Sequence, residues 1–142
     1  MGSKVLRSVF YPELLNGPSG DPAFYIRIAH RGNAFLFDCG DLHALTPREA
    51  IKIQGVFISH AHIDHMVGFG ALLRFFLYRD NPLLIYGPPG ITDRITGHLG
   101  SYTWNLIRDY PIRIGVHELD EGTIRCTDFF GRKAFLPENV KT

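Results

Sequence analysis

The segment that most constrains the fold is a short apolar run, Val56-Phe57-Ile58, followed at once by a cluster of histidines and an aspartate. A continuous apolar run with β-branched and aromatic residues is typical of a strand that is buried on both faces. The cluster Ser59-His60-Ala61-His62-Ile63-Asp64-His65 begins where this strand ends. The sequence therefore predicts a buried strand whose carboxyl end carries side chains that can bind a metal ion.

Turn residues and hydrophobic periodicity predict further strands and helices around this segment. Thr46 is expected to cap a short helix that begins at Pro47 and ends at Gln54-Gly55. The other expected elements are strands over residues 4–10, 23–29, 34–38, 56–58, 83–86, 112–119 and 123–130, and helices over residues 69–79 and 91–106. Strands come first, then strands alternate with helices, then strands follow again. This order predicts an α+β fold, a sheet with helices on one face, in a single domain over residues 1–142.

Composition limits the classes of protein to which the chain can belong. Of its 142 residues 45% are hydrophobic and 20% are charged, which is typical of a globular domain. No segment is long and apolar enough to span a bilayer, and the start lacks the pattern of a secretory signal, so we expect no membrane association and a cytoplasmic location. The net charge of +1 gives no strong field for nucleic acid. Two cysteines, Cys39 and Cys126, are too few for a disulfide framework and are expected to be free thiols.

The residue types in the cluster match the ligands of a catalytic zinc ion. Zinc binds imidazole nitrogens and carboxylate oxygens, and a catalytic site keeps one position open for water. In an extended segment His60 and His62 project to the same side, while Asp64 and His65 follow where the chain curls toward the next helix. Two neighbouring metal ions can brace both oxygens of a displacement reaction. A chance cluster or a structural zinc site are the alternatives, but structural zinc favours cysteine ligands and the cluster has none.

The pattern His60-X-His62-X-Asp64-His65 after an apolar strand resembles the signature of the metallo-β-lactamase superfamily. Phe37-Asp38-Cys39-Gly40 is similar to the aspartate and glycine that follow an early strand in that superfamily. The sequence around the signature, above all Gly68-Phe69-Gly70-Ala71-Leu72-Leu73 and Ile85-Tyr86-Gly87-Pro88-Pro89-Gly90, most resembles the ribonuclease Z branch.

The resemblance implies an αββα sandwich, of which this chain would be the N-terminal, incomplete part. It also implies zinc-dependent hydrolysis of a phosphodiester in RNA, in the type case removal of the 3′ trailer from precursor transfer RNA, by a possible homodimer. His60 and His62 would bind one zinc ion, and Asp64 and His65 the other. Asp64 would also steer or deprotonate the attacking water, and Asp38 would orient a ligand imidazole. Manganese or iron can take the place of zinc, because the same nitrogen and oxygen ligands accept them.

The chain departs from the family pattern downstream of the signature. The family completes its site with a histidine, a bridging aspartate and a last histidine, but residues 129–137 contain no histidine. His98 and His117 have no ligand spacing and are expected to be ordinary surface or core residues. Two other hypotheses therefore remain: a hydrolase of the same superfamily that acts on a thioester or lactam, and a truncated, non-catalytic metal-binding chain. The turn Gly87-Pro88-Pro89-Gly90 is expected to be a simple turn or part of the active-site rim.

Overall fold

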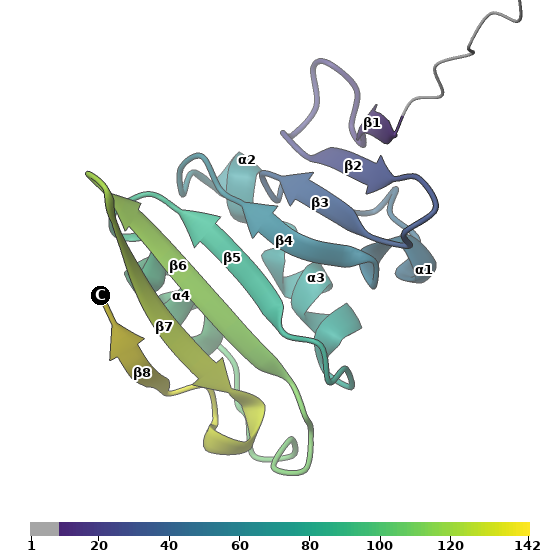
Figure 1. The fold of residues 1–142 in the computed structure, drawn as a ribbon. Coiled ribbons are helices and arrows are strands. Elements are labelled where there is room, and N and C mark those ends of the chain that lie inside the picture. Colours follow the sequence, from purple (N-terminus) through teal and green to yellow (C-terminus); the bar gives the residue numbers. More distant parts are fainter. Residues whose placement is uncertain (1–8) are drawn as a thin grey trace, which may run out of the picture.

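The computed structural model describes residues 9–142, which form one mixed sheet with helices packed against it (Figure 1). The strands are β1 Phe10–Leu14, β2 Phe24–Ile28, β3 Ala34–Phe37, β4 Ile53–Phe57, β5 Leu83–Gly87, β6 Arg113–Asp120, β7 Thr123–Phe130 and β8 Pro137–Lys141. The helices are α1 Pro47–Ala50, α2 Ile63–Met66, α3 Phe69–Phe76, α4 Ile91–Gly100 and the 3₁₀ helix η1 Gly131–Lys133. Within the described residues no helix has the length and apolarity needed to cross a bilayer.

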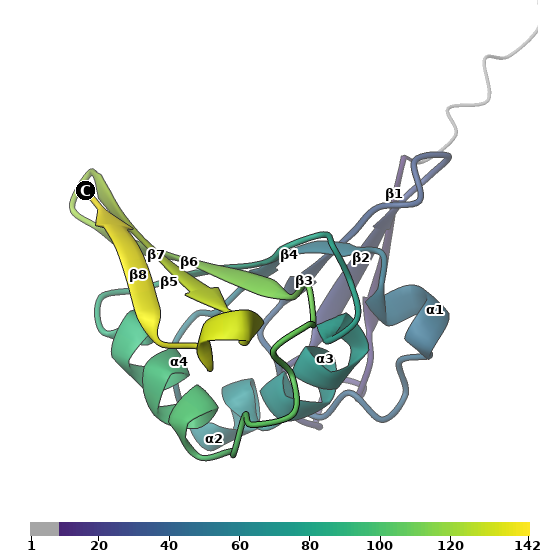
Figure 2. The ribbon, with the colours of Figure 1, turned by 90° about the horizontal axis from the view of Figure 1, so that it is seen from below.

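The strands lie side by side in the order in which they occur in the chain, from β1 to β8. β3, β4, β5 and β6 run parallel to one another, and the strands outside this group pair antiparallel. Each parallel connection contains at least one helix, and such crossovers are almost always right-handed. Because the order never reverses, the same handedness places α1, α2, α3 and α4 on one face of the sheet, as Figure 2 shows.

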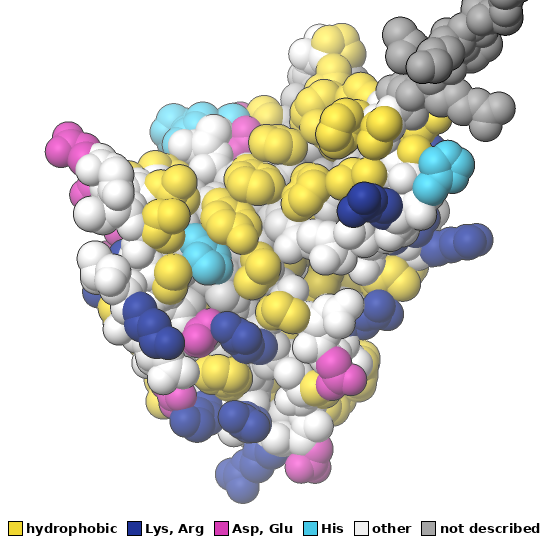
Figure 3. Space-filling view, viewed as in Figure 1, with side chains coloured by type: hydrophobic (Ala, Val, Ile, Leu, Met, Phe, Trp, Pro, Cys, Tyr) yellow, Lys and Arg dark blue, Asp and Glu magenta, His cyan; other side chains and the backbone are white. Residues whose placement is uncertain are grey.

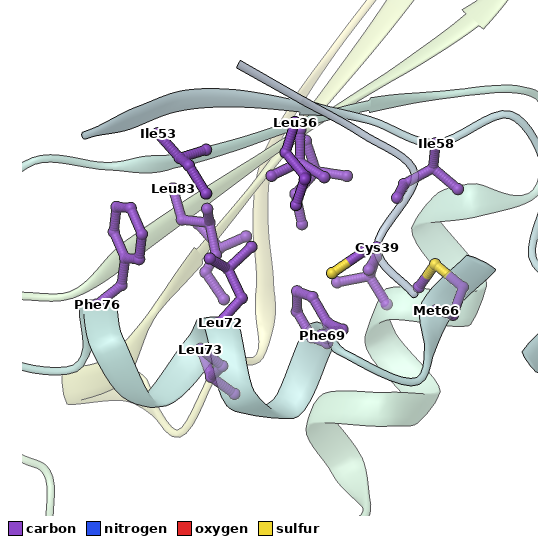
Figure 4. Packing of buried hydrophobic residues seen from close by; sticks show 14 of the residues in the cluster. Leu36, Cys39, Ile53, Ile58, Met66, Phe69, Leu72, Leu73, Phe76 and Leu83 are labelled. Carbon is purple, nitrogen blue, oxygen red and sulfur yellow. The ribbon is translucent and has the colours of Figure 1, made fainter. Parts of the chain in front are cut away.

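The hydrophobic core fills the space between the sheet and these helices (Figure 4). The sheet contributes Leu36, Ile53 and Leu83, and α3 contributes Leu72 and Phe76, each at most 2% exposed. The spacing of the apolar residues in α3 turns one side of the helix to the sheet. This packing fixes the segment that leads from the end of β4, through the histidine cluster, into α3.

Within residues 9–142 no helix lies on the opposite face of the sheet, and this face is also rich in apolar side chains (Figure 3). Four rings stack across neighbouring strands on this face: Phe37 on Phe57 with centroids 4.9 Å apart, Phe57 on Tyr86 at 4.9 Å, and Tyr86 on His117 at 4.7 Å. Phe37 is 40% exposed. We call this side, which carries Phe37, Phe57, Tyr86 and His117, the open face. One sheet with helices on one side and an apolar open face corresponds to one half of an αββα sandwich.

Three predicted elements have boundaries that the structure corrects by four residues or more. The opening strand, expected over residues 4–10, runs from Phe10 to Leu14; residues 4–8 lie outside the described part of the chain. All five residues of β1 are exposed, so no alternation of buried and exposed positions marked this edge strand. The helix that begins at Pro47 ends at Ala50, and Gln54-Gly55 lies inside β4. A glycine fits there because the Tyr86 ring covers it: a β-carbon would lie 3.3 Å from the ring.

The helix expected over residues 91–106 ends at Gly100. Side chains that follow the helix bind its last carbonyl groups: Ser101 Oγ donates to His98 O at 2.6 Å, and Trp104 Nε1 donates to Leu99 O at 2.7 Å. Satisfying these carbonyls ends the helix without a further turn. The last strand, β8, was not predicted at all. Most of its residues are exposed, and among the described strands it pairs only with β7, at the edge of the sheet.

Candidate metal centre

The predicted site residues meet at one edge of the sheet because they follow parallel strands. Asp38 comes directly after β3 and Ser59 lies just beyond β4, while the turn after β5 begins at Pro88. Carboxyl ends of parallel strands lie at the same edge of a sheet, where α/β proteins commonly place their sites. The histidines of the cluster lie in the connection from β4 to α2, and His62 is the residue before the first turn of that short helix.

A network of hydrogen bonds centred on Ser59 ties Asp38 to the cluster. Asp38 Oδ1 accepts from Ser59 N at 2.8 Å and from Ser59 Oγ at 2.8 Å. The other carboxylate oxygen of Asp38 lies 3.0 Å from His65 Nδ1. Ser59 Oγ also lies 3.0 Å from His60 Nδ1 and 3.2 Å from His65 Nδ1. Asp38 therefore contacts one predicted ligand imidazole directly and reaches a second through a hydroxyl group.

Asp38 adopts a backbone conformation that few side chains tolerate, with φ of +58°. Aspartate and asparagine are enriched there, because their short polar side chains bond locally. The bonds from Ser59 to this carboxylate are not local in sequence: they join the ends of β3 and β4 across 21 positions. The strained backbone thus aims the carboxylate of Asp38 at the histidine cluster.

Close backbone contacts hold the helical half of the cluster against the loop after β3. Cys39 N donates to His65 O at 2.8 Å, and Gly68 N donates to Cys39 O at 3.0 Å. A β-carbon on Gly68 would lie 2.0 Å from Gly40 O, and one on Gly40 would lie 2.7 Å from Asp64 O. Two glycines are therefore needed for this approach, which sets the position of Asp64 and His65.

The donor atoms of the cluster lie in two pairs. His60 Nε2 is 3.1 Å from His62 Nδ1, and His65 Nε2 is 3.5 Å from Asp64 Oδ2. Two ligands on one tetrahedral zinc ion, each about 2.0 to 2.1 Å from the metal, are about 3.3 Å apart. Both pairs are close to this separation, so the donors fit a zinc-type ion in kind and in spacing.

Neither pair forms a full ligand set. Among residues 9–142 no group of three or more histidine, cysteine, aspartate or glutamate side chains is arranged to hold a metal ion. Catalytic zinc sites usually have three protein ligands. The described residues thus offer two half-sites, each in need of at least one more donor.

His98, His117 and Cys39 lie outside the predicted set of ligands. His98 is in α4 and His117 is in β6, as predicted. Burial lowers the pKa of both; for His117, Asp128 opposes the effect and Arg113 adds to it. Cys39 is fully buried beside the cluster, and burial raises the pKa of its thiol to about 12. Its thiol therefore stays protonated, as expected for an apolar packing residue.

Two hollows lie next to the cluster. One has a volume of about 360 Å³ and is lined by His60, Ala61, His62, the turn Pro88-Pro89-Gly90, Ile91 and Arg94. Arg94 is the only permanently charged residue in that lining. The other, of about 470 Å³, lies on the open face between the ends of β3, β4 and β5 and reaches Asp38 and Ser59. The turn after β5 thus forms part of the rim, which was one of the two predictions for it.

Ser59 and Arg94 are the residues near the site to which the sequence alone assigned no role. Ser59 lies inside the motif, between the end of a strand and the first histidine. This position could have indicated that it contacts the site residues. Arg94 lies 29 positions beyond His65. Only the pairing of β4 with β5 brings α4 near the cluster, so no local pattern could have indicated it.

No family model matches the chain. It is 39% identical over 106 residues to ribonuclease Z of Bacillus velezensis, which covers 68% of this chain and 32% of that protein. It is 37% identical over 103 residues to ribonuclease Z of Methanococcus aeolicus, covering 67% of this chain and 30% of the relative. The chain belongs to the ribonuclease Z-like branch of the metallo-β-lactamase superfamily. It spans about a third of the length of the curated relatives it matches.

Comparison with solved structures supports the fold of this ribonuclease Z-like chain. The short form of human tRNase Z is similar with a TM-score of 0.50 and 23% sequence identity, over 91% of this chain and 59% of that one. The predicted fold class, a partial metallo-β-lactamase domain, is confirmed. Membership of this superfamily implies metal ions in general; the identity of the metal and the ligand assignment stay predictions.

Proposed function

We propose that this chain provides part of the active site of a ribonuclease Z-like phosphodiesterase that acts on RNA, in the manner of transfer RNA 3′ processing. The observation that carries the proposal is the pairing of donor atoms at the end of β4, His60 with His62 and Asp64 with His65. We assign the first pair to one zinc ion and the second pair to another, with manganese or iron as substitutes. Residues 1–142 are proposed to form one partial domain of a cytoplasmic, homodimeric protein.

Asp64 and Asp38 would have different roles in the hydrolysis. A bound metal ion would supply a polarised, more acidic water. The side chain of Asp64 is half exposed, so its carboxylate can face that water and accept a proton from it. Asp38 keeps the ring of His65 in a fixed orientation by its contact with Nδ1, which leaves Nε2 on the side of Asp64.

Arg94 supports a phosphodiester as the substrate. It lines the same hollow as His60 and His62, and a guanidinium can bind two phosphate oxygens at once. Replacing Arg94 by alanine is expected to weaken binding of a short single-stranded RNA about tenfold, the effect of losing one hydrogen bond to a charged group. Arg48→Ala, on the exposed surface of α1, is the matched control and should leave binding unchanged. Equal affinity of the Arg94 variant and the control would argue against a phosphate contact.

Metal content tests the ligand assignment directly. The purified chain should retain zinc below full occupancy after dialysis, and His62→Ala should lose it. His43→Ala removes an exposed histidine outside the cluster and should retain the wild-type content. Unchanged metal in the His62 variant would overturn the assignment of this residue. Cleavage of an aryl phosphodiester by a protein with the complete ligand set would support the substrate class, while hydrolysis of a thioester or lactam alone would refute it.

One observation favours the second hypothesis, a non-catalytic metal-binding chain. The described residues supply two donors to each proposed ion, one fewer than a catalytic zinc site needs. For the 142-residue chain alone we therefore expect weak metal binding and little hydrolysis. Full activity of this chain by itself would refute that expectation.

A further inference from the structure

The hollow between the histidine cluster and α4 has walls of different chemical kinds. One wall is the first donor pair, His60 and His62, and another is apolar, formed by Pro88 and Pro89. Arg94 in α4 adds a positive charge. The volume of about 360 Å³ is near the lower end of the range for small-molecule sites, about 300 to 1,000 Å³. The hollow therefore suits a single small ligand that has both an anionic and an apolar part.

This hollow lies outside the open face. Its lining comes from the cluster, the turn after β5 and the start of α4. Figure 2 shows α4 packed on the face of the sheet opposite to the open face. A second sheet that packs on the open face would therefore not lie between α4 and the cluster.

The apolar wall belongs to a turn that β6 holds in place. Glu118 Oε2 in β6 accepts from Thr92 N at 3.1 Å. Burial raises the pKa of this carboxyl, but hydrogen bonds from Thr92 and Gly90 and the charge of Arg125 lower it below the ordinary value. Gly90 has φ of +89°, a conformation that favours glycine. These contacts fix the position of the two prolines that precede Gly90.

The same carboxylate leaves Arg94 as the group that can bind an anion in the hollow. Backbone amides at the start of a helix commonly bind anions. At the start of α4, however, the amides of Gly90 and Thr92 already donate to Glu118. An anionic ligand would therefore depend on the guanidinium and not on the helix terminus.

Arg94 is exposed and is available to a ligand. Among the residues that the structure describes, no carboxylate forms an ion pair with it, whereas Arg113 and Lys133 are each paired. Arg94 lies four residues after Gly90, so the two residues are neighbours on one side of α4. Its planar guanidinium can bind two oxygens of one phosphate group.

We propose that this hollow binds one unpaired nucleotide of the RNA, with a phosphate on Arg94 and the base against Pro88 and Pro89. The base must be unpaired, because a base inside a duplex is stacked on both faces and cannot reach an apolar wall. The lining includes the first donor pair but neither residue of the second, so the nucleotide lies on the side of the first pair. The inference rests on the proposed function, which places a phosphodiester at the cluster.

Binding of small ligands to the purified 142-residue chain tests the two contacts separately. Adenosine 5′-monophosphate (AMP), adenosine and inorganic phosphate are titrated with a chelator present, so that no metal ion binds the phosphate. The NMR signals of the Gly90 and Arg94 amides report binding. AMP is expected to bind about tenfold more tightly than either smaller ligand, since each of these lacks one of the contacts.

Two variants remove one contact each. Arg94→Gln should weaken binding of AMP about tenfold and leave binding of adenosine unchanged. Pro89→Ala, at an exposed position, should weaken binding of AMP and adenosine about threefold and leave inorganic phosphate unchanged. Arg48→Gln, on the exposed surface of α1, is the control and should match wild type. Circular dichroism checks that each variant is folded.

The outcomes decide each part of the proposal. An Arg94 variant that binds AMP as tightly as the control would overturn the phosphate contact, and a Pro89 variant that binds adenosine as tightly as wild type would overturn the base contact. A single-stranded RNA should displace AMP; equal displacement by a blunt RNA duplex would overturn the need for an unpaired base.

Failure of this inference can be told apart from failure of the proposed function. A chain that retains zinc through His62 but does not bind AMP would overturn the nucleotide site and leave the metal assignment standing. A chain that binds AMP through Arg94 but retains no zinc would overturn the metal assignment and leave the nucleotide site standing.

Discussion

Replacing Asp38 by asparagine tests whether the network around Ser59 holds the ends of β3 and β4 together. Asparagine has the same shape and tolerates the backbone conformation with φ of +58°. It turns one carboxylate oxygen into an amide group that donates and cannot accept. At least one bond from Ser59 or His65 is then lost. Because the side chain of Asp38 is only 17% exposed, water replaces that bond poorly.

The expected cost follows from the kind of bond. A hydrogen bond to a charged group contributes about 1.5 to 3 kcal/mol, so Asp38→Asn should lower the free energy of unfolding by about 2 kcal/mol. Asp38→Ala loses the whole network and keeps a β-carbon in the left-handed region, whereas Asp38→Gly loses the network without that backbone cost. The glycine variant should therefore be more stable than the alanine variant by about 1 kcal/mol.

Urea unfolding followed by far-UV circular dichroism and by the fluorescence of Trp104 measures these differences. Asp120→Asn, at the start of the exposed turn between β6 and β7, controls for loss of charge and should change stability by less than about 0.5 kcal/mol. An Asp38→Asn variant as stable as this control would refute a stabilising role of the network. A glycine variant no more stable than the alanine variant would refute the backbone part of the reasoning.

Three further predictions concern packing, capping and pH. Gly68→Ala places a β-carbon against backbone atoms and should destabilise the fold by about 3 kcal/mol in the same urea assay. Gly97→Ala in α4, where the β-carbon meets nothing within 4 Å, should instead stabilise it by about 0.5 to 1 kcal/mol. Thr46→Ala removes the capping box of α1 and should cost about 1 kcal/mol, seen as a lower thermal midpoint; no change would argue against the cap. Burial lowers the pKa of His98 and His117, so their contribution to the free energy of unfolding is present above pH 6.5 and is lost as the pH falls below it. A variant with glutamine at both positions should lose less stability between pH 7.5 and 5.5 than the wild type. An equal loss in the two proteins would contradict the prediction.

The elements with strong local signals could be predicted from the sequence. Thr46 and Pro47 indicated the start of α1, and the structure shows Thr46 as its N-cap, in a capping box with Glu49. The apolar run before Ser59 predicted β4, and the helical spacing of apolar residues after Gly68 predicted α3. In each case one local interaction determines the element, either a cap or an apolar face that must be buried.

Features that depend on distant contacts could not be predicted. β8 is an exposed edge strand that pairs with β7, and its own residues show no alternation of buried and exposed positions. Gly55 looked like the end of a helix, but it lies in a strand under the ring of Tyr86, 31 positions later. The role of Asp38 beside the cluster also depends on a distant contact, so only the resemblance to the family predicted it. The bonds that connect it to Ser59 depend on the pairing of β3 with β4.

The apolar open face and the paired donors have a common explanation in the fold. A sheet that is covered by helices on one side and carries stacked aromatic rings on the other is suited to face a second sheet, as in the αββα arrangement. The hollow on the open face reaches Asp38 and Ser59, so a sheet packed there would end beside the histidine cluster. The incomplete ligand set and the uncovered apolar face are therefore both what one sheet of a two-sheet sandwich is expected to have by itself.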